Sequence, residues 1–115
     1  MTYVICVNEI DAVHRWETCP TTHPHNYLSN DHRHRFYIET AFEVRHDDRD
    51  VEIFEMQDAI LKFIGDTFTK EDGLFFIGST SCESLARMIA DELSAKWCEV
   101  REDGRGGARY VREEP

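Results

Sequence analysis

Three histidines are the residues of this sequence whose type and spacing best suit chemistry. His32 and His34 stand two positions apart at the entry of an apolar segment, and His14 lies near the end of the first one. Alternate residues of a strand point to the same face, so His32 and His34 would place their rings on one face about 7 Å apart. If His14 ends a neighbouring strand, three neutral imidazoles meet there. Such a set gives a zinc site with one coordination position open, as in catalytic zinc sites.

Two other interpretations of these histidines stand beside the metal site. Five of the six histidines lie between His14 and His34, and solvated histidines are common in surface loops. His23 and His25 repeat the two-residue spacing, but they lie in the middle of a polar segment with no strand to orient them. From spacing alone, solvated loop histidines are the default interpretation.

The composition limits the function classes. The chain has 115 residues and a net charge of −10, which predicts one domain, residues 1–115, and excludes the clustered basic surface of a nucleic-acid binder. No apolar run approaches the roughly 20 residues of a membrane span, and the first ten residues lack the basic flank of a signal peptide. We therefore expect a cytoplasmic protein with no nucleic-acid or membrane partner. A small anionic ligand is still possible, because a metal or an arginine reverses the field inside one pocket.

The elements that would position the histidines follow from apolar periodicity. Strands have period two, helices have apolar residues three and four apart, and polar clusters mark turns. Thr80 and Glu83 have the spacing of a capping box, which predicts the start of the second helix. The predicted elements are a strand over 2–10 running on toward His14, a loop over 16–31, strands over 35–44 and 51–54, a helix over 56–65, a connection over 66–78, a helix from 80 to 93, and strands over 97–102 and 108–112.

This element order predicts an α+β fold. The strands are mostly joined as hairpins, so the sheet should be largely antiparallel with both helices on one face. Cys6, Cys82 and Cys98 fall within strands or at a helix start. Free cysteines there behave as small apolar residues, and disulfides are not expected in a cytosolic chain.

Several short motifs resemble, in order along the chain, those of the 6-pyruvoyl-tetrahydropterin synthase and 6-carboxytetrahydropterin synthase family. That family has a small-Ala-x-His-Arg motif, a His-Gly-His motif, an apolar run before the first helix, a Pro-Thr-x-Glu helix start, and a last hairpin with Val-x-Val-x-Glu-Thr and Ala-x-Tyr. The matching segments here are 11–15, 32–34, 51–56, 80–83, 98–103 and 108–110.

The resemblance implies an architecture and a site. The implied fold is the T-fold, a four-stranded antiparallel sheet with two helices on one face, assembled into a hexamer-like homo-oligomeric barrel with active sites between subunits. The three histidines would hold Zn²⁺, and Glu102 would anchor a pterin ring by accepting two parallel N–H bonds. Ser81 and Glu83 would bind substrate. From the residues alone, Glu102 would be an ordinary acid beside a turn.

The sequence departs from the family at its acid–base residues. Leu28 stands where the family has a catalytic cysteine, and Thr67 stands where it has a histidine after the aspartate that Asp66 matches. Neither leucine nor threonine can act as a general base. Cys19 could replace the missing thiol if the long loop folds over the metal, since a thiol near zinc has a lowered pKa. His23 and His25 are further candidates for proton transfer.

Three functions follow from these residues. The first is a zinc-dependent lyase or synthase acting on dihydroneopterin triphosphate or a related pterin, on a route to a 7-deazaguanine or a pterin cofactor, with Asp66 and Cys19 as candidate catalytic residues. The second is a catalytically inactive T-fold protein that binds a pterin, purine or nucleotide. The third is an assembly or partner-binding role in which the histidines bind nothing.

Overall fold

Two long segments with alternating burial form the centre of the sheet in the computed structural model, which describes residues 1–113. β1 (Thr2–His14) and β2 (His32–Val44) pair antiparallel along their whole length, with Thr2 opposite Val44 and His14 opposite His32. Even-numbered residues of both strands, such as Ile10 and Ile38, point into the core. The histidines share this parity, so they lie on the same face as the core.

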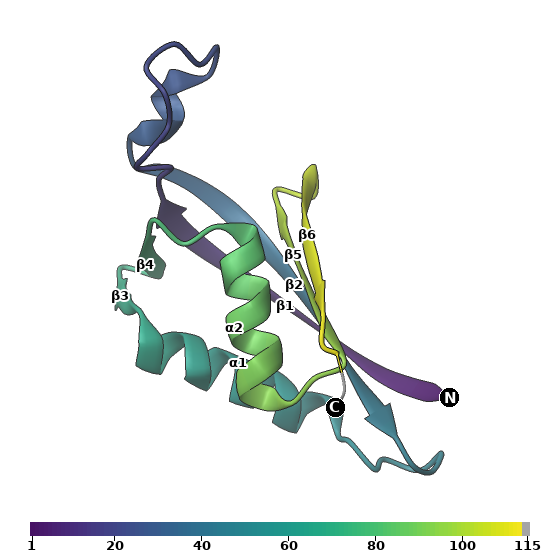
Figure 1. Cartoon of the computed structure of the whole chain (residues 1–115). Coiled ribbons are helices and arrows are strands. Elements are labelled where there is room, and N and C mark those ends of the chain that lie inside the picture. Colours follow the sequence, from purple (N-terminus) through teal and green to yellow (C-terminus); the bar gives the residue numbers. More distant parts are fainter. Residues whose placement is uncertain (114–115) are drawn as a thin grey trace.

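Four shorter strands complete the sheet around this pair (Figure 1). They are β3 (Thr69–Glu71), β4 (Leu74–Gly78), β5 (Trp97–Glu102) and β6 (Gly106–Val111). The order across the sheet is β3-β4-β1-β2-β5-β6, and β4 runs parallel to β1 whereas the other neighbours are antiparallel. The prediction of a four-stranded, wholly antiparallel sheet was therefore wrong: the sheet has six strands and is mixed.

The two additional strands lie in the segment that was predicted to be a connection. Asp72 and Gly73 both have positive φ, 53° and 79°, which is the backbone of the type I′ turn that favours Asp-Gly in a two-residue hairpin loop. Phe75 and Ile77 are buried and alternate with more exposed neighbours. The sequence did not predict these strands because they are short and because β4 pairs with a segment about sixty residues earlier in the chain.

The first helix, α1 (Ile53–Thr67), begins where a return strand was predicted over 51–54. The carboxylate of Glu52 caps this helix by accepting a hydrogen bond from the Glu55 N–H at 2.6 Å. Glutamate is not among the residues preferred at this position, so the sequence carried no strong start signal. Ile60 and Ile64 are fully buried on the inner side of the helix, as the periodicity predicted.

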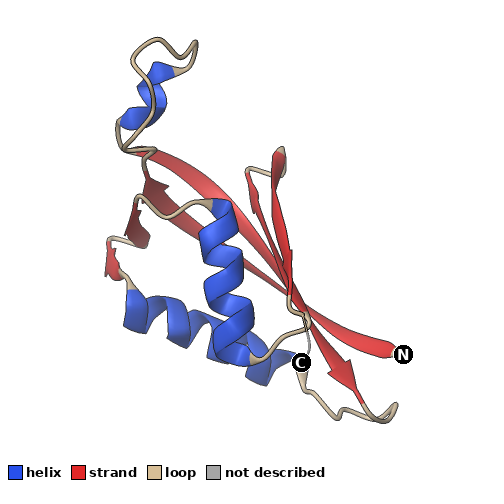
Figure 2. Ribbon diagram, viewed as in Figure 1, coloured by secondary structure: helices blue, strands red, loops and turns tan. Residues whose placement is uncertain are grey.

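The second helix, α2 (Cys82–Leu93), begins one residue later than the predicted capping box. Ser81, rather than Thr80, is its N-cap, and the Ser81 Oγ accepts from the Ser84 N–H at 3.1 Å. Both helices cover the same face of the sheet (Figure 2), which confirms the predicted α+β class with helices packed on a sheet. Neither helix is long and apolar enough to cross a membrane.

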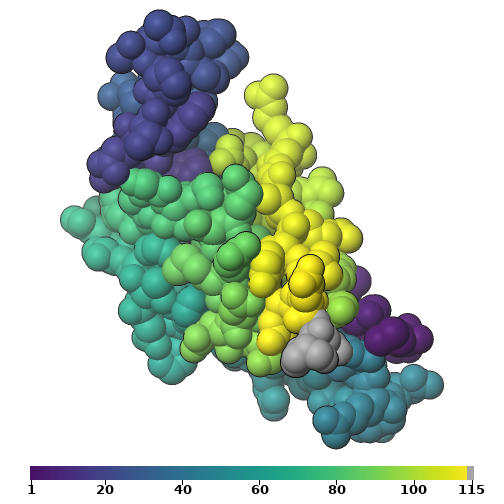
Figure 3. Space-filling model, in the orientation of Figure 1, coloured from purple at the N-terminus to yellow at the C-terminus, as the bar shows by residue number. Residues whose placement is uncertain are grey.

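The connection between β1 and β2, residues 15–31, is called the arm below. It projects from the end of the sheet at which the histidines lie, and the β5–β6 turn projects at the same end (Figure 3). One 3-10 helix, η1 (Asn26–Ser29), interrupts it. The Trp16 N–H donates to the Leu28 carbonyl at 2.7 Å, which closes the base of the arm beside the histidines.

Candidate metal centre

The pairing of β1 with β2 brings the three predicted ligands together. His14 ends β1 directly opposite His32, which begins β2, and His34 follows two residues later on the same face. The ring centroid of His14 is 4.6 Å from that of His32 and 5.3 Å from that of His34, and the centroids of His32 and His34 are 4.9 Å apart. One nitrogen from each ring lies within 4.8 Å of the others. The three histidines could therefore hold one metal ion.

Each ring is oriented by a hydrogen bond from its Nδ1 atom. His14 Nδ1 lies 2.9 Å from the Thr80 carbonyl oxygen, and His32 Nδ1 lies 2.9 Å from that of Asn30. His34 Nδ1 lies 2.6 Å from Asp103 Oδ2. Carbonyl and carboxylate oxygens only accept, so a neutral ring must carry its proton on Nδ1 in all three cases. Nε2 then has a free lone pair, as metal-ligating histidines require.

The carboxylate of Glu102 lies next to two of these three rings. Glu102 Oε1 is 3.4 Å from His14 Nε2, and Oε2 is 3.4 Å from His34 Nε2. Within the described residues, His34 Nε2 is buried without a hydrogen-bond partner. When the histidines are neutral, the lone pairs of His14 Nε2 and His34 Nε2 face the negative charge of Glu102, and a cation would stabilise this arrangement. The donor set thus fits a divalent metal.

Burial affects the protonation of His14, the most buried of the three candidate ligands. His14 is 7% exposed, and desolvation lowers its pKa below the ordinary value, although the Thr80 carbonyl and the Glu102 carboxylate act in the opposite direction. A lowered pKa keeps the ring neutral as the pH falls. Because only the neutral ring can bind a metal, this shift favours metal binding under mildly acidic conditions.

The same shift predicts a pH dependence of folding stability in the metal-free protein. The unfolded state binds a proton on His14 below about pH 6.5, whereas the folded state resists it. The unfolded state therefore binds more protons, and the contribution of His14 is fully present above that pH and is lost as the pH falls through the folded pKa. Denaturant unfolding at several pH values measures the free energy of unfolding. As the pH falls, this free energy should decrease less in His14→Gln than in the unaltered protein. Identical pH profiles of the two proteins would contradict the role given to His14.

A cavity of about 210 Å³ opens beside His14 and His32. The base of the arm supplies Trp16 and Leu28 on one side, and the N-terminus of α2 supplies Ser81 and Glu83 on the other. Glu102 also lines this cavity together with His14 and His32. All three residues to which the family resemblance gives a substrate-binding role, Ser81, Glu83 and Glu102, therefore lie next to the candidate metal ligands.

The structure does not bring the two candidate catalytic residues to this cavity. Asp66 is exposed near the end of α1, where it pairs with Lys62 Nζ at 2.7 Å. Cys19 is buried within the arm, with its Sγ 3.8 Å from the Pro20 carbonyl oxygen and 4.0 Å from that of His25. Neither residue lines the cavity. Asp66 does not reach the cavity because the C-terminal end of α1 faces solvent. Cys19 does not reach it because the arm folds on itself.

The rival pair, His23 and His25, also stays within the arm. The His25 backbone N–H donates to His23 Nδ1 at 2.9 Å, and His25 Nδ1 lies 3.1 Å from the Tyr27 hydroxyl. Within the described residues no third ligand joins them in a group like that of His14, His32 and His34. The geometry thus favours the strand histidines as the metal ligands.

The sequence did not predict a role at the site for two further residues, Cys82 and Asp103. Cys82, interpreted as a small apolar residue, places its thiol 3.4 Å from Glu102 Oε1 and lines the cavity. Burial and the nearby Glu102 carboxylate raise the pKa of this thiol to about 12, so it is protonated at neutral pH and can donate to Glu102. Asp103, interpreted as a turn residue, accepts from His34. The signal available in the sequence for Cys82 was its position between Thr80 and Glu83, at the predicted start of the second helix.

Comparisons with known proteins support the fold and leave the function open. No family model matches the chain, and no curated protein matches it. The crystal structure of an uncharacterized protein from Wolinella succinogenes is similar, with a TM-score of 0.61 at 13% sequence identity over 98% of this chain and 100% of that one. At this identity the likeness concerns the fold, an α+β arrangement of two helices packed on a sheet.

Proposed function

We propose that this protein holds a zinc ion on His14, His32 and His34 and binds a pterin- or purine-like molecule in the adjoining cavity, as a divergent T-fold protein. The observation that carries the proposal is the convergence of one nitrogen from each ring, with the Glu102 carboxylate beside His14 and His34 and, within the described residues, no hydrogen-bond partner for the buried His34 Nε2. Imidazole is a preferred zinc ligand, and three of them leave a position open for a ligand atom. Bound zinc would act there as a Lewis acid.

The lining of the cavity supports a flat heterocyclic ligand. Trp16 and Leu28 supply apolar surface, and Ser81 and Glu102 supply polar groups near the metal ligands. A carboxylate accepts two parallel N–H bonds from the amide-like edge of a pterin or guanine. The resemblance to the tetrahydropterin synthase family gives Glu102 this same role. It also implies a hexamer-like barrel of several chains, in which the outermost strands β3 and β6 would meet those of neighbouring copies.

A second candidate function is a zinc-dependent lyase or synthase acting on dihydroneopterin triphosphate or a related pterin. The observation that favours it is the Cys82 thiol, which lines the cavity and contacts Glu102. It places a titratable group at the site although Leu28 replaces the catalytic cysteine of the family. With its pKa raised to about 12, Cys82 would donate a proton rather than accept one. Since Asp66 and Cys19 lie outside the cavity, ligand binding is the function that the geometry supports best.

Glu102→Gln tests the proposed ligand site. We expect zinc-loaded protein to bind neopterin or guanine, and we expect the substitution to weaken binding by about 10- to 100-fold, because a hydrogen bond to a charged group contributes about 1.5–3 kcal/mol. Titration followed by pterin fluorescence measures the affinity for neopterin, and calorimetry measures that for guanine. Glu43→Gln, on the exposed part of β2, is the matched control and should bind like the unaltered protein.

Two outcomes decide between the candidate functions. Consumption of dihydroneopterin triphosphate by the zinc-loaded protein would support the lyase or synthase, whereas tight binding without turnover would support the binding protein. A zinc-loaded protein that binds neither neopterin nor guanine would contradict both.

A further inference from the structure

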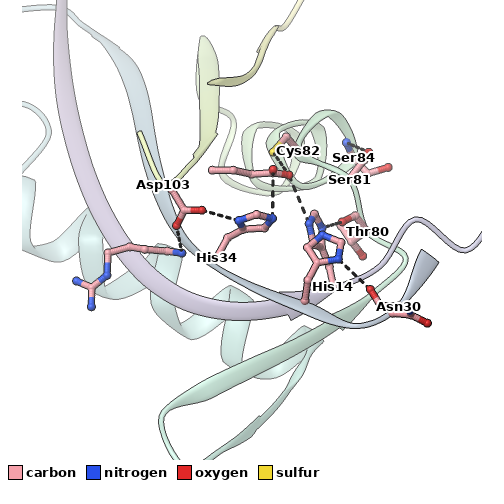
Figure 4. Close-up of polar contacts among 11 residues, drawn as sticks. His14, Asn30, His34, Thr80, Ser81, Cys82, Ser84 and Asp103 are labelled. Atoms are coloured by element: carbon pink, nitrogen blue, oxygen red, sulfur yellow. Dashed lines mark hydrogen bonds and ion pairs between the residues drawn. The ribbon is translucent and has the colours of Figure 1, made fainter. Parts of the chain in front are cut away.

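Asp103 connects the β5–β6 turn to one of the candidate metal ligands (Figure 4). Its Oδ2 atom accepts from His34 Nδ1 at 2.6 Å, and its Oδ1 atom accepts from the Arg35 backbone N–H at 2.8 Å. The Asp103 backbone N–H in turn donates to the Arg35 carbonyl at 2.8 Å. His14 and His32 are oriented by backbone carbonyls, so His34 alone is oriented by a side chain.

We propose that Asp103 is a positioning residue of the metal centre, whose carboxylate fixes the Nδ1–H tautomer of His34 and turns its Nε2 atom toward His14 and His32. The proposal rests on the proposed metal site. Carboxylate–histidine–metal triads orient the ring and raise the basicity of the ligating nitrogen, and a charged acceptor does so more strongly than a carbonyl.

The arrangement requires a carboxylate rather than a carboxamide. The two N–H groups that face Asp103, from His34 and Arg35, each need an acceptor oxygen. Asparagine has one oxygen and one NH₂ group, so it can satisfy only one of them in the same place. With the amide oxygen on Arg35, the NH₂ group faces His34 and drives the ring proton to Nε2, the atom that should bind the metal. Asp103 has φ of 52°, a conformation that asparagine also adopts, so Asp103→Asn keeps the turn.

The tautomer of His34 provides a test that does not depend on metal. Two-bond ¹H–¹⁵N correlation spectra of metal-free protein at about pH 8, where histidines of ordinary pKa are neutral, identify the protonated nitrogen. We expect His34 to carry its proton on Nδ1, and to carry it on Nε2 in Asp103→Asn. A purely structural role in the turn would leave the tautomer unchanged in the variant, and that result would overturn the proposal. Nε2 protonation in the unaltered protein would also overturn it, even if the variant failed to fold.

Zinc affinity provides the second readout. Loss of such a partner weakens metal binding by about 10- to 100-fold, so Asp103→Asn should show this loss in a competition titration against a chromophoric chelator. Asp31→Asn removes the same charge beside His32, where Asp31 pairs with Arg15 and no histidine. We expect this control to bind zinc within about threefold of the unaltered protein. Equal losses of zinc affinity in the two variants would mean that only the charge matters, and would overturn the proposal.

The two proposals can fail separately. Absence of zinc binding in the unaltered protein would contradict the proposed function, whereas the tautomer of His34 still decides the role of Asp103.

Discussion

Replacing His32 with alanine is expected to weaken zinc binding by about a hundredfold to a thousandfold. Zinc held by four protein ligands contributes about 10–16 kcal/mol in small domains. Each of those four ligands therefore accounts for about 2.5–4 kcal/mol. The same share for one histidine of the three-histidine site gives the expected loss, since each 1.4 kcal/mol is a factor of ten in affinity. His32 is the best position for the test because it is half-buried, whereas His14 is buried against the Phe36 ring. Alanine at His14 would leave a hole in the core and confuse metal loss with unfolding.

The matched control for this variant is His25→Ala. His25 belongs to the rival pair in the arm, stands two residues from another histidine as His32 does, and lies on the exposed surface. Competition titration should give this control the zinc affinity of the unaltered protein. If His25→Ala weakens binding and His32→Ala does not, the metal lies in the arm and the site assigned to the strands is wrong.

Replacing Leu85 with alanine is expected to lower the free energy of unfolding by about 2–5 kcal/mol. Leu85 has no exposed surface and lies on the inner side of α2, which packs on β5 and β6. Truncation of a fully buried leucine loses its transfer free energy and leaves a cavity that the neighbours fill only in part. The loss affects the site as well, because α2 places Ser81, Cys82 and Glu83 at the cavity.

Urea unfolding of the metal-free protein measures this change. Glu92→Ala, on the exposed side of the same helix, is the control and should change stability by less than about 0.5 kcal/mol. A loss of less than about 1 kcal/mol in Leu85→Ala, or an equal loss in both variants, would contradict the packing described for α2.

The three candidate metal ligands could be predicted from the sequence because strand parity is a local property. The alternation in β2 fixes His32 and His34 on one face, and the apolar run of β1 leads directly to His14. Their orientation could not be predicted, because the Nδ1 partners come from Thr80, Asn30 and Asp103. Two of these are separated from their histidines by more than sixty residues, and no local pattern gives the register between them.

The parts of the fold that were mispredicted depend on distant pairing or on unusual caps. β4 exists as a strand because it pairs with β1 across the sheet, and the helix α1 starts early because Glu52 caps it. The positions of Asp66 and Cys19 outside the cavity also depend on the three-dimensional arrangement of the chain. Family motifs give the order of residues along the chain. The folding of the arm on itself and the length of α1 decide which side chains reach the candidate metal ligands.

The metal content of the purified protein tests the central claim most directly. Protein produced in zinc-containing medium and freed of loosely bound ions by gel filtration should contain about one zinc per chain by elemental analysis, held by the three histidines. His32→Ala purified in parallel should contain far less. Unaltered protein that retains no divalent metal under these conditions would contradict the assignment of His14, His32 and His34 as a zinc site.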